Sequence, residues 1–66
     1  MKRLIRLAEV ERRTTHRKTE IYRLMRLGEF PRSVRVGPRN VAWVEEEIDA
    51  YVDSKIAQRE AMEAQR

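Results

Sequence analysis

The sequence predicts a mainly α-helical domain that carries one small β-hairpin. Apolar residues recur at spacings of three and four before Gly28 and again after Glu45, which indicates an amphipathic helix on each side. Between these segments, valines alternate with polar residues around residues 37–40, which indicates two short strands joined by a turn. With a short helix near the start of the chain, this order is that of a winged helix-turn-helix. A chain of 66 residues without repeats, low-complexity tracts or linkers is expected to form a single domain over residues 1–66.

The first helix is predicted to be short and to follow an extended start at Leu4. Its apolar residues Leu7, Ala8 and Val10 can face inward. The charged residues of this helix that we expect to face water are Glu9, Arg12 and Arg13. The next three residues, Thr-Thr-His at 14–16, break the apolar pattern and predict a turn in which either threonine can cap the following helix.

The second helix is predicted over residues 17–27. The residues that fall on one stripe, and so form its expected core face, are Ile21, Leu24, Met25 and Gly28. Gly28 is suited to end the helix in a left-handed conformation. Pro31 disfavours helical geometry at Phe30, so the chain should then become extended.

Residues 33–44 are predicted to form a hairpin that serves as the wing. Its expected apolar face consists of Val34, Val36, Val41 and Trp43. The helices should cover this face, because an isolated hairpin is only marginally stable. A four-residue loop at 37–40 would leave Arg39 at the tip.

A third helix is predicted to begin near Glu45. Three successive glutamates, Glu45–Glu47, favour a helix start through the helix dipole, and a metal site is a weaker explanation because neighbouring carboxylates on a helix point to different sides. The buried stripe should continue through Ile48, Tyr51 and Val52. Residues 57–66 have little core to bury and are expected to form a polar helical or frayed extension.

Composition excludes several classes of protein. The absence of Cys rules out disulfides and thiolate metal sites, and the one histidine, His16, is better explained as a turn residue than as a catalytic base or ligand. The small core leaves no room for a catalytic cavity, so we expect no enzyme activity and no cofactor. No membrane span and no signal peptide are expected, which predicts a cytoplasmic, nucleoid-associated protein without a membrane partner.

The charge is distributed very unevenly along the chain. Residues 1–44 contain 12 Lys and Arg against 4 Asp and Glu, a net charge of +8, whereas residues 45–66 contain 3 against 7, a net charge of −4. A basic half of this kind attracts polyanions. An anionic membrane is disfavoured because no basic helix carries a continuous apolar face, so double-stranded DNA is the leading partner.

The second helix and the wing carry the candidate DNA contacts. In a helix-turn-helix the second helix enters the major groove, and its first turn meets base edges. The expected contacts are Arg17, Lys18, Thr19, Tyr22, Arg23 and Arg26 from the helix, with Arg35, Arg39 and Asn40 from the wing. Arg23 is the leading candidate to read a base, because arginine can donate two hydrogen bonds to guanine O6 and N7.

Each candidate also has a structural explanation. Charged helix residues on a small domain commonly only face solvent. Asn40 can simply satisfy the turn. Arg32 and Arg35 can extend the DNA contact or pair equally well with Glu45–Glu47. Trp43 is expected in the core rather than as a platform for stacked bases.

Two segments carry a resemblance to a known family. These are IRLAEVERRT at residues 5–14 and IYRLMRLGEFPRSVRVGPRNVAWVEEEIDAYV at residues 21–52, and the resemblance continues into the trailing helix to about Arg59. They resemble the AlpA family of short phage and prophage regulators, which is related to MerR-type helix-turn-helix proteins and to winged-helix excisionases. The resemblance implies a DNA-binding transcriptional regulator, in many cases of a neighbouring integrase or of prophage excision.

The sequence departs from the family pattern at the turn between the first two helices. Thr15, His16 and Arg17 stand where such proteins usually have a small apolar turn and a serine cap. We expect His16 to weaken the contact between the two helices without removing the fold. Arg17 in place of the cap could add a contact to phosphate or guanine.

The sequence therefore predicts a DNA-binding transcriptional regulator of a phage, prophage or other mobile element. Residues 17–27 would lie in the major groove and the wing on the backbone or in the minor groove. An excisionase that bends DNA and recruits an integrase is the alternative, and a protein-interaction module without DNA activity is a more distant one. Self-association, as a dimer or cooperatively on DNA, is a hypothesis with the C-terminal helix or the wing as the contact surface.

Overall fold

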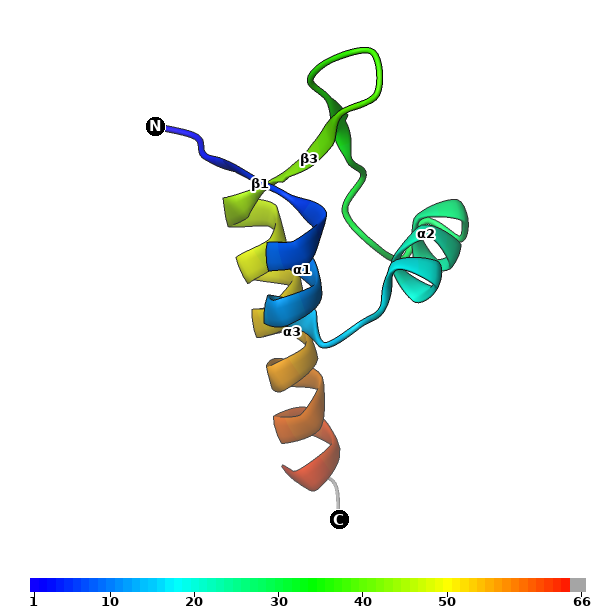
Figure 1. Ribbon diagram of the computed structural model, residues 1–66. Helices are drawn as coiled ribbons and strands as arrows, with labels where there is room; N and C mark the ends of the chain where they lie inside the picture. Colours follow the sequence, from blue (N-terminus) through cyan, green and yellow to red (C-terminus); the bar gives the residue numbers. More distant parts are fainter. Residues whose placement is uncertain (65–66) are drawn as a thin grey trace.

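The computed structural model describes residues 1–64 and has the predicted winged helix-turn-helix arrangement. Its elements in chain order are β1 (Leu4–Ile5), α1 (Leu7–Thr14), α2 (Lys18–Arg26), β2 (Val34–Arg35), β3 (Val41–Val44) and α3 (Glu45–Ala64). In Figure 1, α1 lies beside the first half of α3, and α2 stands off to one side. The hairpin loop projects at one end of the molecule, and α3 points toward the other end.

The extended start of the chain is an edge strand of a three-stranded sheet. The strand order is β1-β3-β2, and both pairings are antiparallel. Ile5 pairs with Trp43, and Leu4 pairs with Val44. The sequence predicted an extended conformation here but not this pairing, because two residues are too short to show an alternating pattern.

The predicted apolar face of the hairpin is wrong by one residue. The register pairs Arg35 with Val41, and the Val36 N–H donates to the Asn40 carbonyl at 2.9 Å, so three residues form the loop instead of four. A shift of one residue moves a side chain to the other face of the sheet. Val34 and Val36 therefore lie on the face opposite Trp43, and they are exposed.

One cluster of apolar side chains forms the core. Its buried members are Ile5, Val10, Ile21, Leu24, Phe30, Trp43 and Ile48. Trp43 is fully buried, as predicted, and its ring meets the edge of Tyr22 on α2 with a centroid distance of 6.3 Å. Phe30 was expected only to lie beyond the helix, but it packs against Tyr51 of α3 at 4.7 Å between ring centroids. Phe30 therefore ties the segment after α2 to α3.

The predicted buried stripes are confirmed only in part. Ile21 and Leu24 are buried and Met25 is half-buried, but Gly28 is exposed because α2 has already ended at Arg26. In α1 the inward residues are Leu7 and Val10, whereas Ala8 is exposed because it lies about 100° round the helix from Leu7. In α3 the predicted stripe is confirmed, with Ile48 buried and Tyr51 and Val52 half-buried.

The helix α3 runs without interruption to Ala64. Its residues from 53 onward are exposed, and residues 57–64 of the predicted polar helical or frayed extension lie within this helix. Residues 65 and 66 of that predicted extension lie outside the described residues.

Arg13 was expected to face water, but it lies in an ion-pair network between α1 and α3. Its guanidinium donates to Glu9 at 2.9 Å, to Glu45 at 2.9 Å and to Asp49 at 3.0 Å. These carboxylates raise the pKa of Arg13, with the hydrogen bond to Glu9 as the largest cause. Glu45 therefore helps to attach the start of α3 to α1.

The cap of α2 comes from α1 and not from a threonine of the turn. The Lys18 N–H donates to a carboxylate oxygen of Glu11 at 3.0 Å, while Arg17 occupies the cap position without a side-chain hydrogen bond. Thr14 is the last residue of α1, and its hydroxyl donates to the Val10 carbonyl at 2.8 Å. The threonine cap was therefore a wrong prediction, because Thr14 is held within α1.

Thr15 and Gly28 both adopt left-handed backbone conformations. Gly28 has φ of 74°, as predicted for the residue that ends α2. Thr15 has φ of 63°, which is unfavourable for a β-branched residue. The turn between α1 and α2 is therefore strained at Thr15.

We expect Thr15→Gly to stabilise the fold. Glycine removes the contact between Cβ and the following carbonyl at positive φ, and part of the gain is offset by the greater freedom of the unfolded chain. The expected gain is about 0.5–1 kcal/mol in the free energy of unfolding, or roughly 2–8 °C in melting temperature for a domain of this size. Thermal unfolding followed by circular dichroism measures it, with exposed Ala57→Gly as a control that should lower the melting temperature. An unchanged or lower melting temperature for Thr15→Gly would contradict strain at Thr15.

Candidate nucleic-acid interface

The outward face of α2 carries most of the predicted contacts. Thr19, Arg23 and Arg26 are exposed, and Tyr22 is half-buried at the flank, where it meets Trp43. Arg17 and Lys18 are exposed at the start of the helix. All six residues predicted for this helix are therefore accessible. Four lie along its outward side and flank, and Arg17 and Lys18 lie at its start.

Arg23 is paired with Glu20, one turn earlier on α2. Its Nε donates to Glu20 Oε1 at 2.9 Å, and its Nη2 donates to Glu20 Oε2 at 2.6 Å. The pair lowers the pKa of Glu20 and raises that of Arg23, in each case mainly through these hydrogen bonds. Sequence reasoning missed Glu20, although a carboxylate three residues before an arginine on a helix is a usable signal.

A shallow depression lies between α2 and the segment that leads into the wing. It is lined by Tyr22, Met25, Arg26, Arg32 and Ser33. Two predicted contacts, Tyr22 and Arg26, thus line the same depression as Arg32. The sequence had left open whether Arg32 contacts DNA or pairs with the glutamates at 45–47. In the described part of the chain neither Arg32 nor Arg35 forms an ion pair, while Glu45 pairs with Arg13 instead.

The wing presents its polar residues to solvent. Arg35 is exposed and, being opposite Val41, lies on the same face of the sheet as Trp43, the face that meets α2. Arg39 and Asn40 are exposed at the loop, which projects away from the helices in Figure 1. The Asn40 amide nitrogen lies 3.4 Å from the position that a Cβ on Gly37 would occupy. Asn40 therefore packs across its own loop, in keeping with the structural role that the sequence also allowed.

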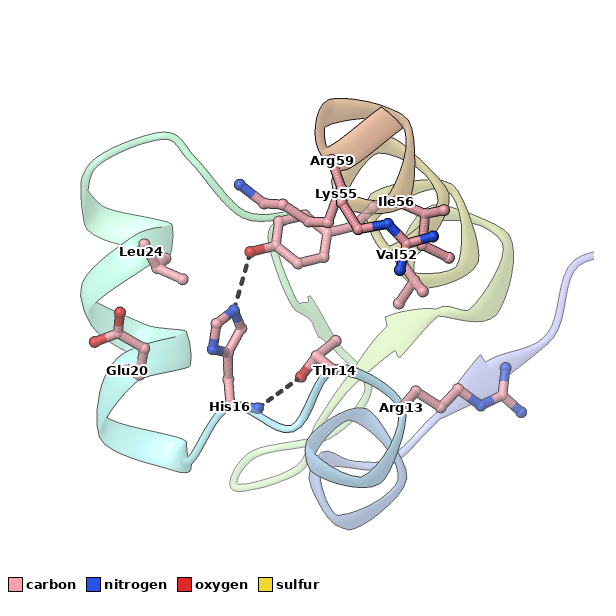
Figure 2. Close-up of a pocket in the computed structure, with 10 residues that line it drawn as sticks. Arg13, Thr14, His16, Glu20, Leu24, Val52, Lys55, Ile56 and Arg59 are labelled. Atoms are coloured by element: carbon pink, nitrogen blue, oxygen red, sulfur yellow. Dashed lines mark hydrogen bonds between the residues drawn. The ribbon is translucent and has the colours of Figure 1, made fainter. Parts of the chain in front are cut away.

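His16 joins the turn to α3. Its Nε2 lies 3.0 Å from the Tyr51 hydroxyl (Figure 2). The His16 ring also makes edge contacts with the rings of Phe30 and Tyr51. Burial is the main cause that raises the pKa of Tyr51. The sequence predicted that His16 would weaken the contact between α1 and α2. The contact of His16 with Tyr51 of α3 compensates for that weakening. No group of three or more potential metal ligands converges anywhere within residues 1–64.

A groove beside His16 separates α2 from the outer part of α3. Leu24, Val52 and Ile56 supply apolar surface, and Lys55 and Arg59 supply positive charge (Figure 2). The Lys55 ammonium lies 5.4 Å from the centroid of the Tyr51 ring. This groove is lined from α2 by Glu20 and Leu24, and none of the nine predicted DNA contacts lines it.

The fold and the exposed basic face define a small winged helix-turn-helix protein with a positively charged second helix and wing. The family described as prophage CP4-57 regulatory protein (AlpA) matches residues 3–56. A relative in Enterobacteria phage P4, described as uncharacterized protein ORF88, is 40% identical over 57 residues. That alignment covers 86% of this chain but 65% of the relative, so the chain spans somewhat less than two thirds of the relative's length.

The chain belongs to the AlpA family of prophage regulatory proteins. The comparison with solved structures found no match. Among the helices described, none has both the length and the apolar character that crossing a membrane requires.

Proposed function

We propose that this protein is a sequence-specific DNA-binding transcriptional regulator of a phage, prophage or other mobile element. The observation that carries the proposal is the set of exposed cations on α2, at its start and on the wing. Within residues 1–64, five of these cations form no ion pair with a carboxylate; they are Arg17, Lys18, Arg26, Arg35 and Arg39. Unpaired cations on a helix-turn-helix are free to contact phosphate. Such a protein would act in the bacterial cytoplasm, on the nucleoid.

The two elements have different roles in this proposal. The helix α2 lies in the major groove, where Arg23 donates to a guanine and Thr19 or Tyr22 contacts a thymine methyl or a phosphate. Arg17, Lys18 and Arg26 hold phosphates on either side of the groove. The wing places Arg39 on the backbone or in the minor groove, with Arg35 beside it. A contact set of this size neutralises about 5 to 8 phosphates, so affinity should fall steeply with salt.

Binding to DNA from upstream of the protein's own gene tests the proposal. The purified protein is titrated against that DNA and against scrambled DNA of equal length, at two salt concentrations. Preference for the upstream DNA that persists at the higher salt supports a sequence-specific regulator. Equal, salt-sensitive binding to both would contradict it for that DNA.

Arg23→Ala separates base reading from general attraction. We expect this change to cost roughly 1–3 kcal/mol in affinity for the preferred site. It should cost less on scrambled DNA, because no guanine contact is lost there. Lys2→Ala removes the same charge from the exposed start of the chain, outside α2, the wing and α3, and is the matched control. Equal losses from Arg23→Ala and Lys2→Ala would favour a basic surface without base reading, or the protein-interaction alternative.

The outer part of α3 supports the proposal that a protein partner also binds. Ile56 and Met62 are large apolar residues that are 43% and 64% exposed on this part of the helix. The proposal includes self-association, as a dimer or cooperatively on DNA, with this exposed part of α3 or the wing as the contact surface. Sedimentation that shows a monomer, bound to a single half-site with nanomolar affinity, would count against the dimer.

The exposed outer part of α3 also suits the alternative proposal, that the protein is an excisionase. An excisionase would use α2 and the wing to bend DNA and the exposed face of α3 to recruit an integrase. Stimulation of excision in a purified reaction with the integrase of the same element would favour this role over transcriptional regulation.

A further inference from the structure

The Glu20–Arg23 pair leaves one edge of the arginine free. A guanidinium group has a lateral edge, made by Nε and Nη2, and a terminal edge, made by Nη1 and the second hydrogen of Nη2. Glu20 occupies the lateral edge with both of its oxygens, at 2.9 and 2.6 Å. Within the described residues the terminal edge donates to no side chain. Two parallel N–H groups therefore remain available on Arg23.

The free edge matches the acceptors of guanine. Guanine presents O6 and N7 in the major groove as two neighbouring acceptors, and arginine binds them with two parallel N–H groups. The Arg23 and Glu20 side chains are 50% and 39% exposed, so the free edge is open to solvent. An arginine already held by a carboxylate also loses less conformational freedom on binding than a free one.

The carboxylate also changes what Arg23 prefers to bind. Beside Glu20 the pair has no net charge, so its attraction for a phosphate is weak, and the carboxylate itself repels phosphates. A guanine edge carries no formal charge and still accepts both hydrogen bonds. Specificity can be gained by weakening the wrong contact as well as by strengthening the right one.

We propose that Glu20 is a positioning residue that holds Arg23 by its lateral edge and so directs its terminal edge to a guanine rather than to phosphate. This inference rests on the proposed function, since it assigns a role to Glu20 within the same DNA-binding face. Glu20 lowers the affinity for DNA of any sequence and raises the discrimination between a site with the guanine and one without it.

The test compares three DNAs of equal length. They are the preferred site, the same site with one G·C pair replaced by A·T, and a scrambled sequence. The pair to replace is the one at which Arg23→Ala abolishes discrimination. Discrimination is the ratio of the dissociation constants for the altered and preferred sites.

Glu20→Ala is expected to reduce this discrimination roughly tenfold, as the loss of an oriented bidentate contact implies. It should also tighten binding to scrambled DNA several-fold. Glu29→Ala is the matched control, because the Glu29 charge also acts on Arg23 but makes no hydrogen bond to it in the described residues. Glu29→Ala should tighten binding to all three DNAs by similar factors and leave discrimination unchanged. Glu20→Gln, which keeps one acceptor, should retain more discrimination than Glu20→Ala.

The effect must depend on Arg23. In an Arg23→Ala background, where discrimination at this base pair is already abolished, Glu20→Ala should leave the ratio of dissociation constants unchanged, and any change in that ratio there would overturn the positioning role. Unchanged discrimination in the Glu20→Ala single variant would also overturn it, while leaving the proposed function intact. If the unmodified protein itself prefers no DNA sequence, the proposed function fails first and the role of Glu20 fails with it. Circular dichroism checks that each variant retains the helical fold.

Discussion

The double variant Arg26→Ala/Arg39→Ala is expected to bind its preferred DNA at least about a hundredfold more weakly at moderate salt. Arg26 lies on the outward face of α2, and Arg39 lies at the tip of the wing, so the two residues report on separate elements. Each makes a charge-assisted hydrogen bond in the proposed complex, worth about 1.5–3 kcal/mol. The Arg26 contact is to the backbone, and where Arg39 also contacts the backbone rather than the minor groove, the loss should be similar for preferred and scrambled DNA.

Fluorescence anisotropy over a range of salt concentrations measures this loss. The slope of log affinity against log salt should decrease in magnitude by about 2, since each arginine releases about one counterion. The control is Lys2→Ala/Arg3→Ala, which removes the same charge from the exposed start of the chain, outside α2, the wing and α3. Equal losses in the two double variants would mean that net charge, and not a face made by α2 and the wing, governs binding.

Trp43→Ala is expected to remove a large part of the protein's stability at 25 °C. Trp43 is fully buried at the centre of the core, between α2 and β1. Truncation of a buried aromatic residue costs about 3–5 kcal/mol, and a domain of this length has a total stability on the order of 3–10 kcal/mol. Urea unfolding followed by circular dichroism at 222 nm measures the change, and Trp43→Phe should give a folded protein of intermediate stability.

Val36→Ala is the companion to this experiment. The sequence placed Val36 on the same buried face as Trp43, whereas the three-residue loop puts it on the opposite face with 52% exposure. An exposed substitution of this kind should change stability by less than about 0.5 kcal/mol. A loss of several kcal/mol in the free energy of unfolding from Val36→Ala would favour the four-residue loop and contradict the pairing of Arg35 with Val41.

Local signals in the sequence were enough for the order of the elements. Gly28 and Pro31 act on their own backbone, and Glu45–Glu47 act on the first turn of their own helix, so their effects do not depend on distant residues. The outward face of α2 follows from helical periodicity alone, which is why Thr19, Arg23 and Arg26 were placed correctly as exposed residues.

Contacts between residues that are far apart along the chain could not be predicted from the sequence. The Glu11 cap on α2 and the Arg13 network each depend on how α1 is oriented toward its neighbours. The contact between His16 and Tyr51 joins residues 35 positions apart and likewise could not be predicted. Such partners are chosen by packing in three dimensions, and no spacing along the chain encodes them.

The sequence by itself determined the fold class, the basic second helix and wing, and the family to which the chain belongs. Periodicity, turn residues and charge distribution suffice for these features because each acts over a few residues or over the whole composition. Only the tertiary structure decided the register of the wing, the burial of Phe30 and the pairing of Arg23 with Glu20. The register depends on a loop shorter by one residue, and both the burial and the pairing depend on which side chains the folded chain brings within contact distance.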